Sequence, residues 1–344
     1  MKINTCSTCG GRIEFSPKDR AVKCLSCGTN YPIKYKQLVA KHPIDWVPEE
    51  EKLLAWSDTL RTKKCDNCGA EVVFEKYDIA TNCKYCNTNV ITSLKSLPGL
   101  QPEKVIPFNI SKNKAKDAFA KNVRKRHFLP LDFKKNLPKT EIQNSYISSF
   151  NFECDVVATY NGRKKITTSY RDSKGVSRSK TEYRNFSGTI KKSFPNVLVE
   201  SSNKLNQNEI TQVYPYDFQQ SFDYDEGFVI GYNVGYYNQN INIAEQNAKD
   251  IIRKDIEKEI NRLHSNIVSL TINPQYNNIR YNYTLLPLYF VKYNYKNKPY
   301  INVMNGQTGA TGGDVPRSKT QITLFTLFII LIVSLPLLFI FLSN

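Results

Sequence analysis

The stretch Cys6-Ser7-Thr8-Cys9-Gly10, followed by Cys24-Leu25-Ser26-Cys27-Gly28, decides the expected fold of the N-terminal part of the chain. The pattern returns further along the chain as a second pair of Cys-x2-Cys motifs, and the spacing of the four cysteines is identical in both copies. Two thiolates with this spacing reach one metal ion, and four thiolates complete a tetrahedral structural zinc site. The sequence therefore predicts two tandem zinc ribbons that hold two structural Zn²⁺ ions. The predicted ligands are Cys6, Cys9, Cys24, Cys27, Cys65, Cys68, Cys83 and Cys86.

The residues around the cysteines support a ribbon. A residue that tolerates a left-handed backbone follows the second cysteine of every motif, as the turn requires. These residues are Gly10, Gly28, Gly69 and Asn87. The β-prone stretches Arg12–Phe15 and Val72–Phe74 lie between the motifs and suit hairpins. A ribbon of about 30 residues has too small a core to fold alone, so metal binding is expected to supply the folding energy.

Three other uses of these cysteines stay open. Disulfides need an oxidising compartment. An iron centre of the rubredoxin kind uses similar motifs. A catalytic zinc ion keeps an open position, whereas four cysteines close the shell. The ninth cysteine, Cys154, lies in a β-prone run and is expected to be a buried small hydrophobic residue, with a reactive thiol as the alternative. His42 is interpreted as part of the linker between the ribbons.

Composition divides the chain of 344 residues into five expected parts within the α+β class. They are a first zinc ribbon (1–35), a helical linker (36–62), a second ribbon (63–95), a larger basic α+β domain with a stalk (103–316) and one C-terminal transmembrane helix (322–342). Apolar content of 40% and charged content of 23% argue against general disorder. The linker is expected to form a short helix over Pro48–Trp56.

The C-terminal expectation depends on the uncharged run Ile322–Leu342. A helix of that length spans about 31 Å, which matches the hydrocarbon core of a bilayer. Arg317 and Lys319 precede the run, so the positive-inside rule predicts a cytoplasmic N-terminal part. The N-terminus shows no secretory signal. The predicted location is the cell membrane, with a single, tail-anchored span.

The region 104–314 is expected to be an α+β domain. Apolar periodicity predicts helices after Ser111 and over Ile243–Leu263. β-prone runs predict strands, of which the last two form a hairpin across residues 296–299. The predicted strands are Phe152–Tyr160, Lys165–Arg171, Phe228–Tyr236, Leu285–Tyr295 and Tyr300–Met304. The glycine-rich segment Asn305–Asp314 is interpreted as a turn leading into a flexible stalk, because it lacks the Lys-Ser/Thr of a phosphate loop.

The formal net charge of +17 is concentrated in one segment. Residues 101–200 contain 21 Lys and Arg against 9 Asp and Glu, whereas the rest of the chain is nearly balanced. An anionic lipid surface, an acidic protein or a nucleic acid would suit this charge. Because the predicted span would place the domain beside a membrane, the lipid surface or an acidic protein is favoured.

The sequence also resembles the bacterial TFIIB-type zinc-ribbon-containing membrane proteins, over most of its length. The resemblance rests on the ribbon at Cys65–Cys86, Val105–Phe108, Tyr214–Asp217, Gly227–Tyr237, Leu286–Tyr289, Met304–Gly309 and Gly313–Pro316. It implies a partner among proteins similar to SPFH-domain (flotillin-like) or phage-shock-protein-A-like proteins, recruited to the membrane under envelope stress.

The leading hypothesis is a non-catalytic, tail-anchored membrane scaffold whose cytoplasmic zinc ribbons and α+β domain recruit a protein partner. The alternative is a membrane-tethered zinc-ribbon protein that binds nucleic acid. An enzyme is not expected, because His127 and His264 lie on helical patterns without a paired carboxylate motif.

Overall fold

We describe the protein from a computed structural model. The structure describes residues 5–34, 41–46, 61–74, 78–86, 88–91, 100–135, 137, 140–202, 204–205 and 207–342. The expected linker helix over Pro48–Trp56 and the residue Asn87 lie outside these ranges.

The secondary structure consists of short strands at the N-terminus, a few very long strands in the middle and five α-helices among the described residues. The helices are α1 (Lys112–Arg124), α2 (Leu131–Lys135), α3 (Gln207–Val213), α4 (Ile241–Leu263) and α5 (Lys319–Leu342), with 3₁₀ helices η3 (Phe218–Gln220) and η4 (Glu226–Val229). The N-terminal strands are β1 (Ile13–Ser16), β2 (Ala21–Cys24), β3 (Asn30–Pro32), β4 (His42–Pro43), β5 (Arg61–Lys64), β6 (Glu71–Phe74), β7 (Asp78–Asn82) and β8 (Asn89–Ile91). The remaining strands are β9 (Lys104–Val105), β10 (Glu141–Arg171), β11 (Ser177–Glu200), β12 (Phe222–Asp223), β13 (Asn233–Gly235), β14 (Ile267–Tyr295), β15 (Lys298–Asn305) and β16 (Thr311–Gly312).

The expected α+β class is wrong, because the chain is mostly β, with 44% strand and 24% helix. The strands β10, β11 and β14 contain 31, 24 and 29 residues. The sequence predicted two separate strands, Phe152–Tyr160 and Lys165–Arg171, on either side of the polar stretch Asn161–Lys164. In the structure that stretch continues the strand, because β11 pairs with it on one side and β14 on the other.

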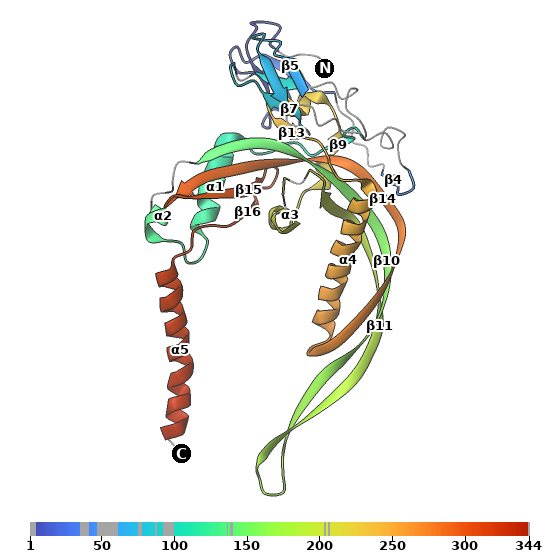
Figure 1. Cartoon of the computed structure of the whole chain (residues 1–344), viewed down its shortest axis with the longest axis vertical. Coiled ribbons are helices and arrows are strands. Elements are labelled where there is room, and N and C mark those ends of the chain that lie inside the picture. Colours follow the sequence, from blue (N-terminus) through green and yellow to red (C-terminus); the bar gives the residue numbers. More distant parts are fainter. Residues whose placement is uncertain are drawn as a thin grey trace.

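These three strands form a curved antiparallel sheet with β10 in the centre (Figure 1). The register of β10 shifts against both of its neighbours near Cys154. The shift against β11 lies between Phe152 and Cys154, and the shift against β14 lies between Glu153 and Asp155. An extra residue in one strand bends it and increases its twist. Such irregularities are expected to add to the curvature of the sheet, which forms an arch in Figure 1.

Helix α4 lies on the concave side of this arch (Figure 1). Its buried face consists of Ile241, Ala244, Ala248, Ile252, Ile256 and Ile260. The cluster that these residues form includes Val156, Ala158 and Ile272 of the sheet. Lys192 of β11 also holds the helix, because its Nζ lies 2.6 Å from Asp255 and 3.2 Å from Glu259. The amphipathic helix predicted over 243–263 is therefore confirmed, with Asn240 as its N-cap.

The upper part of the long sheet is buried on both faces. Tyr281–Tyr289 of β14 are buried without a break, and the same is true of Ser145–Phe152 of β10. A second apolar cluster, which includes Ile147, Leu286 and Val213 of α3, covers the face opposite to the main core. Continuous buried runs are what a sheet covered on both sides produces.

Other local predictions had mixed outcomes. The helix after Ser111 is α1, with Ala115, Phe119 and Val123 buried, and the C-terminal hairpin is formed by β14 and β15. The strand predicted over Phe228–Tyr236 is wrong in its first half, which is the end of η4 and a turn. The segment Asn305–Asp314 is not a free stalk, because Asn305 is buried and donates from Nδ2 to the carbonyl of Val213.

The predicted transmembrane span at 322–342 is also wrong, and with it the predicted single-pass membrane location. Among the described residues, no helix combines the length and the apolar character that crossing a bilayer requires. The apolar run does form a helix, α5.

Candidate metal centres

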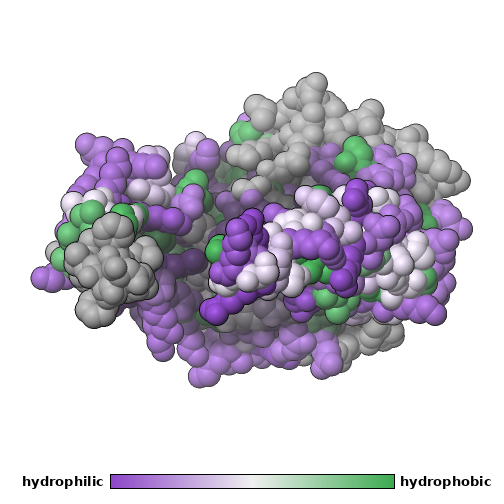
Figure 2. Space-filling model, turned by 90° about the horizontal axis from the view of Figure 1, so that it is seen from below, coloured by the Kyte–Doolittle hydropathy of each residue, from purple (hydrophilic) through white to green (hydrophobic). Residues whose placement is uncertain are grey.

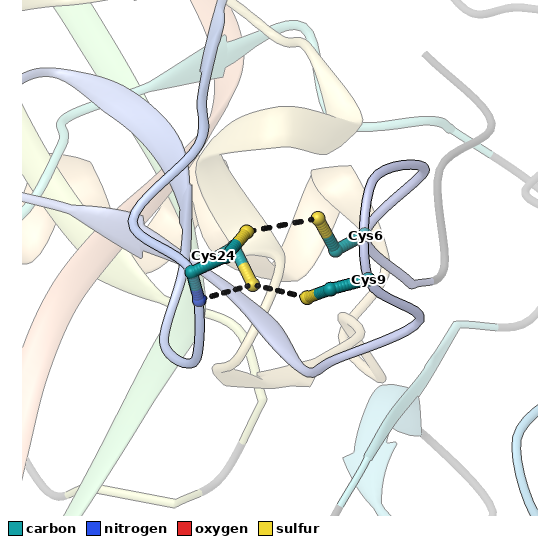
Figure 3. Close-up of side chains that lie close together, drawn as sticks. Cys6, Cys9 and Cys24 are labelled. Carbon is teal, nitrogen blue, oxygen red and sulfur yellow. Dashed lines mark hydrogen bonds between the residues drawn. The ribbon is translucent and has the colours of Figure 1, made fainter.

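The first group of four cysteines is formed by two loops of the N-terminal sheet β1-β2-β3 (Figure 3). Cys6 and Cys9 lie on the loop before β1, whereas Cys24 ends β2 and Cys27 lies in the turn before β3. The sulfur atoms of Cys6 and Cys27 are 3.6 Å apart, as are those of Cys9 and Cys24. All four sulfur atoms lie within 4.8 Å of one another. Such a group could hold one metal ion.

The second group has the same geometry. The sulfur atoms of Cys65 and Cys86 are 3.6 Å apart, and those of Cys68 and Cys83 are 3.7 Å apart. A disulfide requires about 2.05 Å between its sulfur atoms, so these thiols are close without being bonded. The structure therefore brings together all eight cysteines that the sequence analysis selected, in the two groups of four that their spacing predicts.

The two ribbons repeat each other beyond the cysteines. Aligning the two cysteine patterns places Phe15 of β1 on Phe74 of β6, and both are 1% exposed. The same alignment places β3 on β8, residue for residue. The turns after Cys9, Cys27 and Cys68 contain glycines with φ of 68°, 79° and 73°, as predicted. An internal duplication of the ribbon is thus visible in the structure.

Hydroxyl groups beside Cys6, Cys27 and Cys86 lower the pKa of these three thiols and so favour the thiolate, which is the form that binds metals. The Tyr31 hydroxyl lies 3.2 Å from the sulfur of Cys6, and this hydrogen bond is the largest cause that lowers the pKa of Cys6 to about 5. Thr88 acts likewise on Cys86, whose pKa falls to about 5. The equivalent residue of the first ribbon, Thr29, lowers the pKa of Cys27. Sequence analysis did not select these hydroxyl groups, although the two threonines occupy equivalent positions of the repeat.

The first ribbon packs against the larger domain that contains the long sheet. The backbone N–H of Phe15 donates to the carbonyl of Ile230 at 2.9 Å. The Phe15 ring packs 5.4 Å from that of Phe228, between centroids. Ile33 is so close to Gly227 that a Cβ there would lie 2.9 Å from its side chain. The first ribbon therefore packs on the segment 226–235, which runs from η4 to β13.

The second ribbon docks on the same segment. Its strand β7 pairs with β13, which in turn pairs in parallel with β10. Tyr232 contacts both ribbons, because its hydroxyl donates to the carbonyl of Phe15 and its own carbonyl accepts from Nδ2 of Asn89. The Tyr232 ring stacks on Phe108 at 4.6 Å, deep in the core. Tyr232 thus joins both metal groups to the long sheet, a role that nothing in the local sequence indicates.

The remaining candidate residues lie apart from the metal groups. Cys154 is 5% exposed, and burial raises its pKa to about 11, so the prediction of a buried small residue is confirmed. His42 is not a simple linker residue, because it lies in β4, stacks on Trp46 at 3.7 Å and hydrogen-bonds Glu103. His127 is exposed, and His264 is half-buried at the end of α4, 3.2 Å from the Tyr160 hydroxyl.

Comparison with known proteins finds a relative with a similar sequence over most of the chain. The uncharacterized protein YdjG of Bacillus subtilis (strain 168) is 26% identical over 321 residues, which cover 92% of this chain and 91% of that protein. No protein-family model matches the chain. No solved structure matches it either.

Proposed function

We propose that the protein is a non-catalytic zinc protein that binds a protein partner. The observation that carries the proposal is the closed ligand set of both metal groups. A tetrahedral centre with Zn–S bonds near 2.3 Å has sulfur atoms about 3.8 Å apart. The sulfur pairs of 3.6 and 3.7 Å are close to this value. Four protein thiolates leave zinc no position for a substrate or a water molecule, so the ions would stabilise the fold.

Helix α5 supports a protein as the ligand. Large apolar side chains on all sides of its described part are exposed, from Ile322 at 37% to Leu324 at 67%. They are Ile322, Leu324, Phe325, Leu327, Phe328, Ile329, Ile330, Leu331, Ile332 and Val333. Exposed apolar patches of this extent mark interaction sites. Near its start the helix touches the body, where the ring of Phe325 lies 5.3 Å from that of Phe128.

The resemblance described above suggests which partner to test first. Proteins similar to SPFH-domain or phage-shock-protein-A-like proteins, encoded in the same genome, are the candidates that it implies. Such a partner would have to offer an apolar surface to α5, because that helix contributes the largest uncovered apolar area among the described residues.

The experiment measures zinc content and partner binding on the same purified full-length chain. Elemental analysis should find two zinc ions per chain. The substitutions Leu324→Glu and Leu327→Glu together should weaken binding of the candidate partner at least tenfold, because each places a charge on an apolar contact. Thr320→Glu on the polar first turn of α5 is the control. Binding that is unchanged by the double substitution would contradict the proposal.

A further inference from the structure

The hairpin formed by the distal ends of β10 and β11 extends beyond the rest of the sheet. Strand β14 begins at Ile267 and pairs with β10 only as far as Lys164. From the pair Lys165–Tyr183 to the pair Arg171–Ser177 the hairpin has two strands alone. In Figure 1 it forms the lowest part of the molecule, beyond the end of α4. We call residues 163–185 the arm.

The arm has no core of its own. Both faces are open to solvent, and nearly all of its residues are exposed. Figure 2, which views the molecule from this end, shows a mainly hydrophilic surface there. An isolated two-stranded hairpin is only marginally stable in water. The arm extends about 24 Å beyond the sheet, at 3.4 Å per residue. Because a hairpin of this kind is only marginally stable alone, we expect it to contact another molecule.

The charge of the arm is strongly positive. It contains eight Lys and Arg residues against two acidic residues, Asp172 and Glu182. Those two carboxylates pair with Arg178 at 2.7 Å, Lys180 at 2.8 Å and Arg184 at 3.4 Å. The other five cations form no ion pair with any described residue. They are Arg163, Lys164, Lys165, Arg171 and Lys174.

The two faces of the arm differ. Residues that pair across the hairpin share a face, so odd-numbered positions of both strands lie together. One face continues from Tyr160, next to α4, and carries all the ion-paired cations together with Glu182. The opposite face, which we call the outer face, has no acidic residue between Arg163 and Asn185. Its members are Arg163, Lys165, Thr167, Ser169, Arg171, Ser177, Ser179, Thr181, Tyr183 and Asn185.

We propose that the outer face of the arm binds the major groove of duplex DNA. The major groove is about 12 Å wide and admits a two-stranded β-ribbon. Arginine, lysine, serine, threonine and tyrosine are the side chains that contact phosphates, and all five occur on this face. The guanidinium of Arg163 lies over the Tyr183 ring at 5.4 Å, which orients it. A projecting ribbon that is two strands wide suits a groove better than the flat surface of a lipid bilayer.

The proposal is independent of the protein partner, because α5 does not contribute to the arm. It predicts that the zinc-loaded full chain binds a labelled mixed-sequence DNA duplex at about 50 mM salt in a fluorescence anisotropy titration. Arg163→Gln, Lys165→Gln and Arg171→Gln together should weaken binding roughly tenfold or more, and should reduce the slope of log K against log salt by about 3. The matched control combines Arg178→Gln, Lys180→Gln and Arg184→Gln, which remove the same charge from the other face and should change the slope less.

Several results would overturn the proposal. They are an equal loss in both triple variants, no binding of DNA by the original chain, or tighter binding to polyglutamate or to phosphatidylserine vesicles than to DNA. Equal binding of an RNA duplex would also overturn it, because side chains cannot enter the narrow major groove of A-form RNA. Zinc content and circular dichroism verify that the variants fold. If the outer-face variant does not fold, a chain in which a two-residue Asn-Gly turn replaces residues 165–183, the whole two-stranded part, must lose DNA binding.

Discussion

Cys24 and Cys154 show how environment decides the role of one residue type. Both side chains are buried, at 1% and 5% exposure. Cys24 ends β2 beside three other thiols, within 3.6 Å of the sulfur of Cys9. Cys154 lies alone at the irregularity of β10, where burial is the largest cause that raises its pKa to about 11. A metal ligand needs other ligand atoms within reach of the same ion, whereas a packing residue needs apolar neighbours.

Replacing these two cysteines should therefore give different results. Cys24→Ser should reduce the zinc content from two ions to one per chain, because three thiolates hold the ion far less well. Cys154→Ser should leave both ions in place and cost only stability. Elemental analysis of the purified variants measures this difference. Two zinc ions in the Cys24 variant would show that this residue is not a ligand.

The thiol of Cys154 should also resist alkylation in the folded protein. Since its pKa is raised to about 11, the neutral thiol dominates at pH 8 and the nucleophilic thiolate is rare. Mass spectrometry after iodoacetamide treatment should find Cys154 modified only when denaturant is present. Rapid modification without denaturant would mean that this part of β10 opens readily.

At the scale of the element, α4 is what shields the apolar part of a sheet with such long strands. It covers the concave face with a row of small and branched apolar residues, and its outer face carries charges. Where α4 ends, at Leu263, the sheet narrows soon afterwards to the two-stranded arm. The extent of the helix therefore coincides with the extent of the apolar face on the sheet.

Ile256→Ala should lower the free energy of unfolding by about 2–5 kcal/mol, because Ile256 is fully buried between α4 and the sheet. Glu257→Ala, one residue away on the exposed face, should change it by less than about 0.5 kcal/mol. Urea denaturation of both variants gives the comparison. Equal effects would show that α4 is not packed on the arch as described.

At the scale of the whole molecule, the two ribbons that carry the cysteine groups are joined to the long sheet through one short segment. Both ribbons dock on residues 226–235, where Tyr232 contacts each of them and the core. The second ribbon has only a small apolar cluster of its own, so a metal ion held by its four cysteines would contribute much of its stability. The distal half of the long sheet packs on α4 instead, away from the cysteines (Figure 1).

Removal of zinc with a chelator should therefore unfold the ribbons and spare the arch. Hydrogen exchange followed by mass spectrometry should show loss of protection in residues 5–34 and 61–91. The paired strands around residues 155–163 and 267–277 should keep most of theirs. Complete loss of protection, or none, would contradict this division of the molecule.

The sequence by itself determined the local features: the eight cysteines in two groups, the ribbon turns at Gly10, Gly28 and Gly69, the packing role of Cys154, and the apolar faces of α1 and α4. These features follow from short-range spacing in the sequence, which does not depend on contacts with distant segments.

Only the tertiary structure decided the length of β10, the packing of both ribbons around Tyr232, the outer face of the arm and the class of the fold. The polar stretch Asn161–Lys164 could not be recognised as a strand, since its pairing partners lie in other parts of the chain, at 184–187 in β11 and at 267–271 in β14. Contacts between distant segments, rather than local preference, set these features.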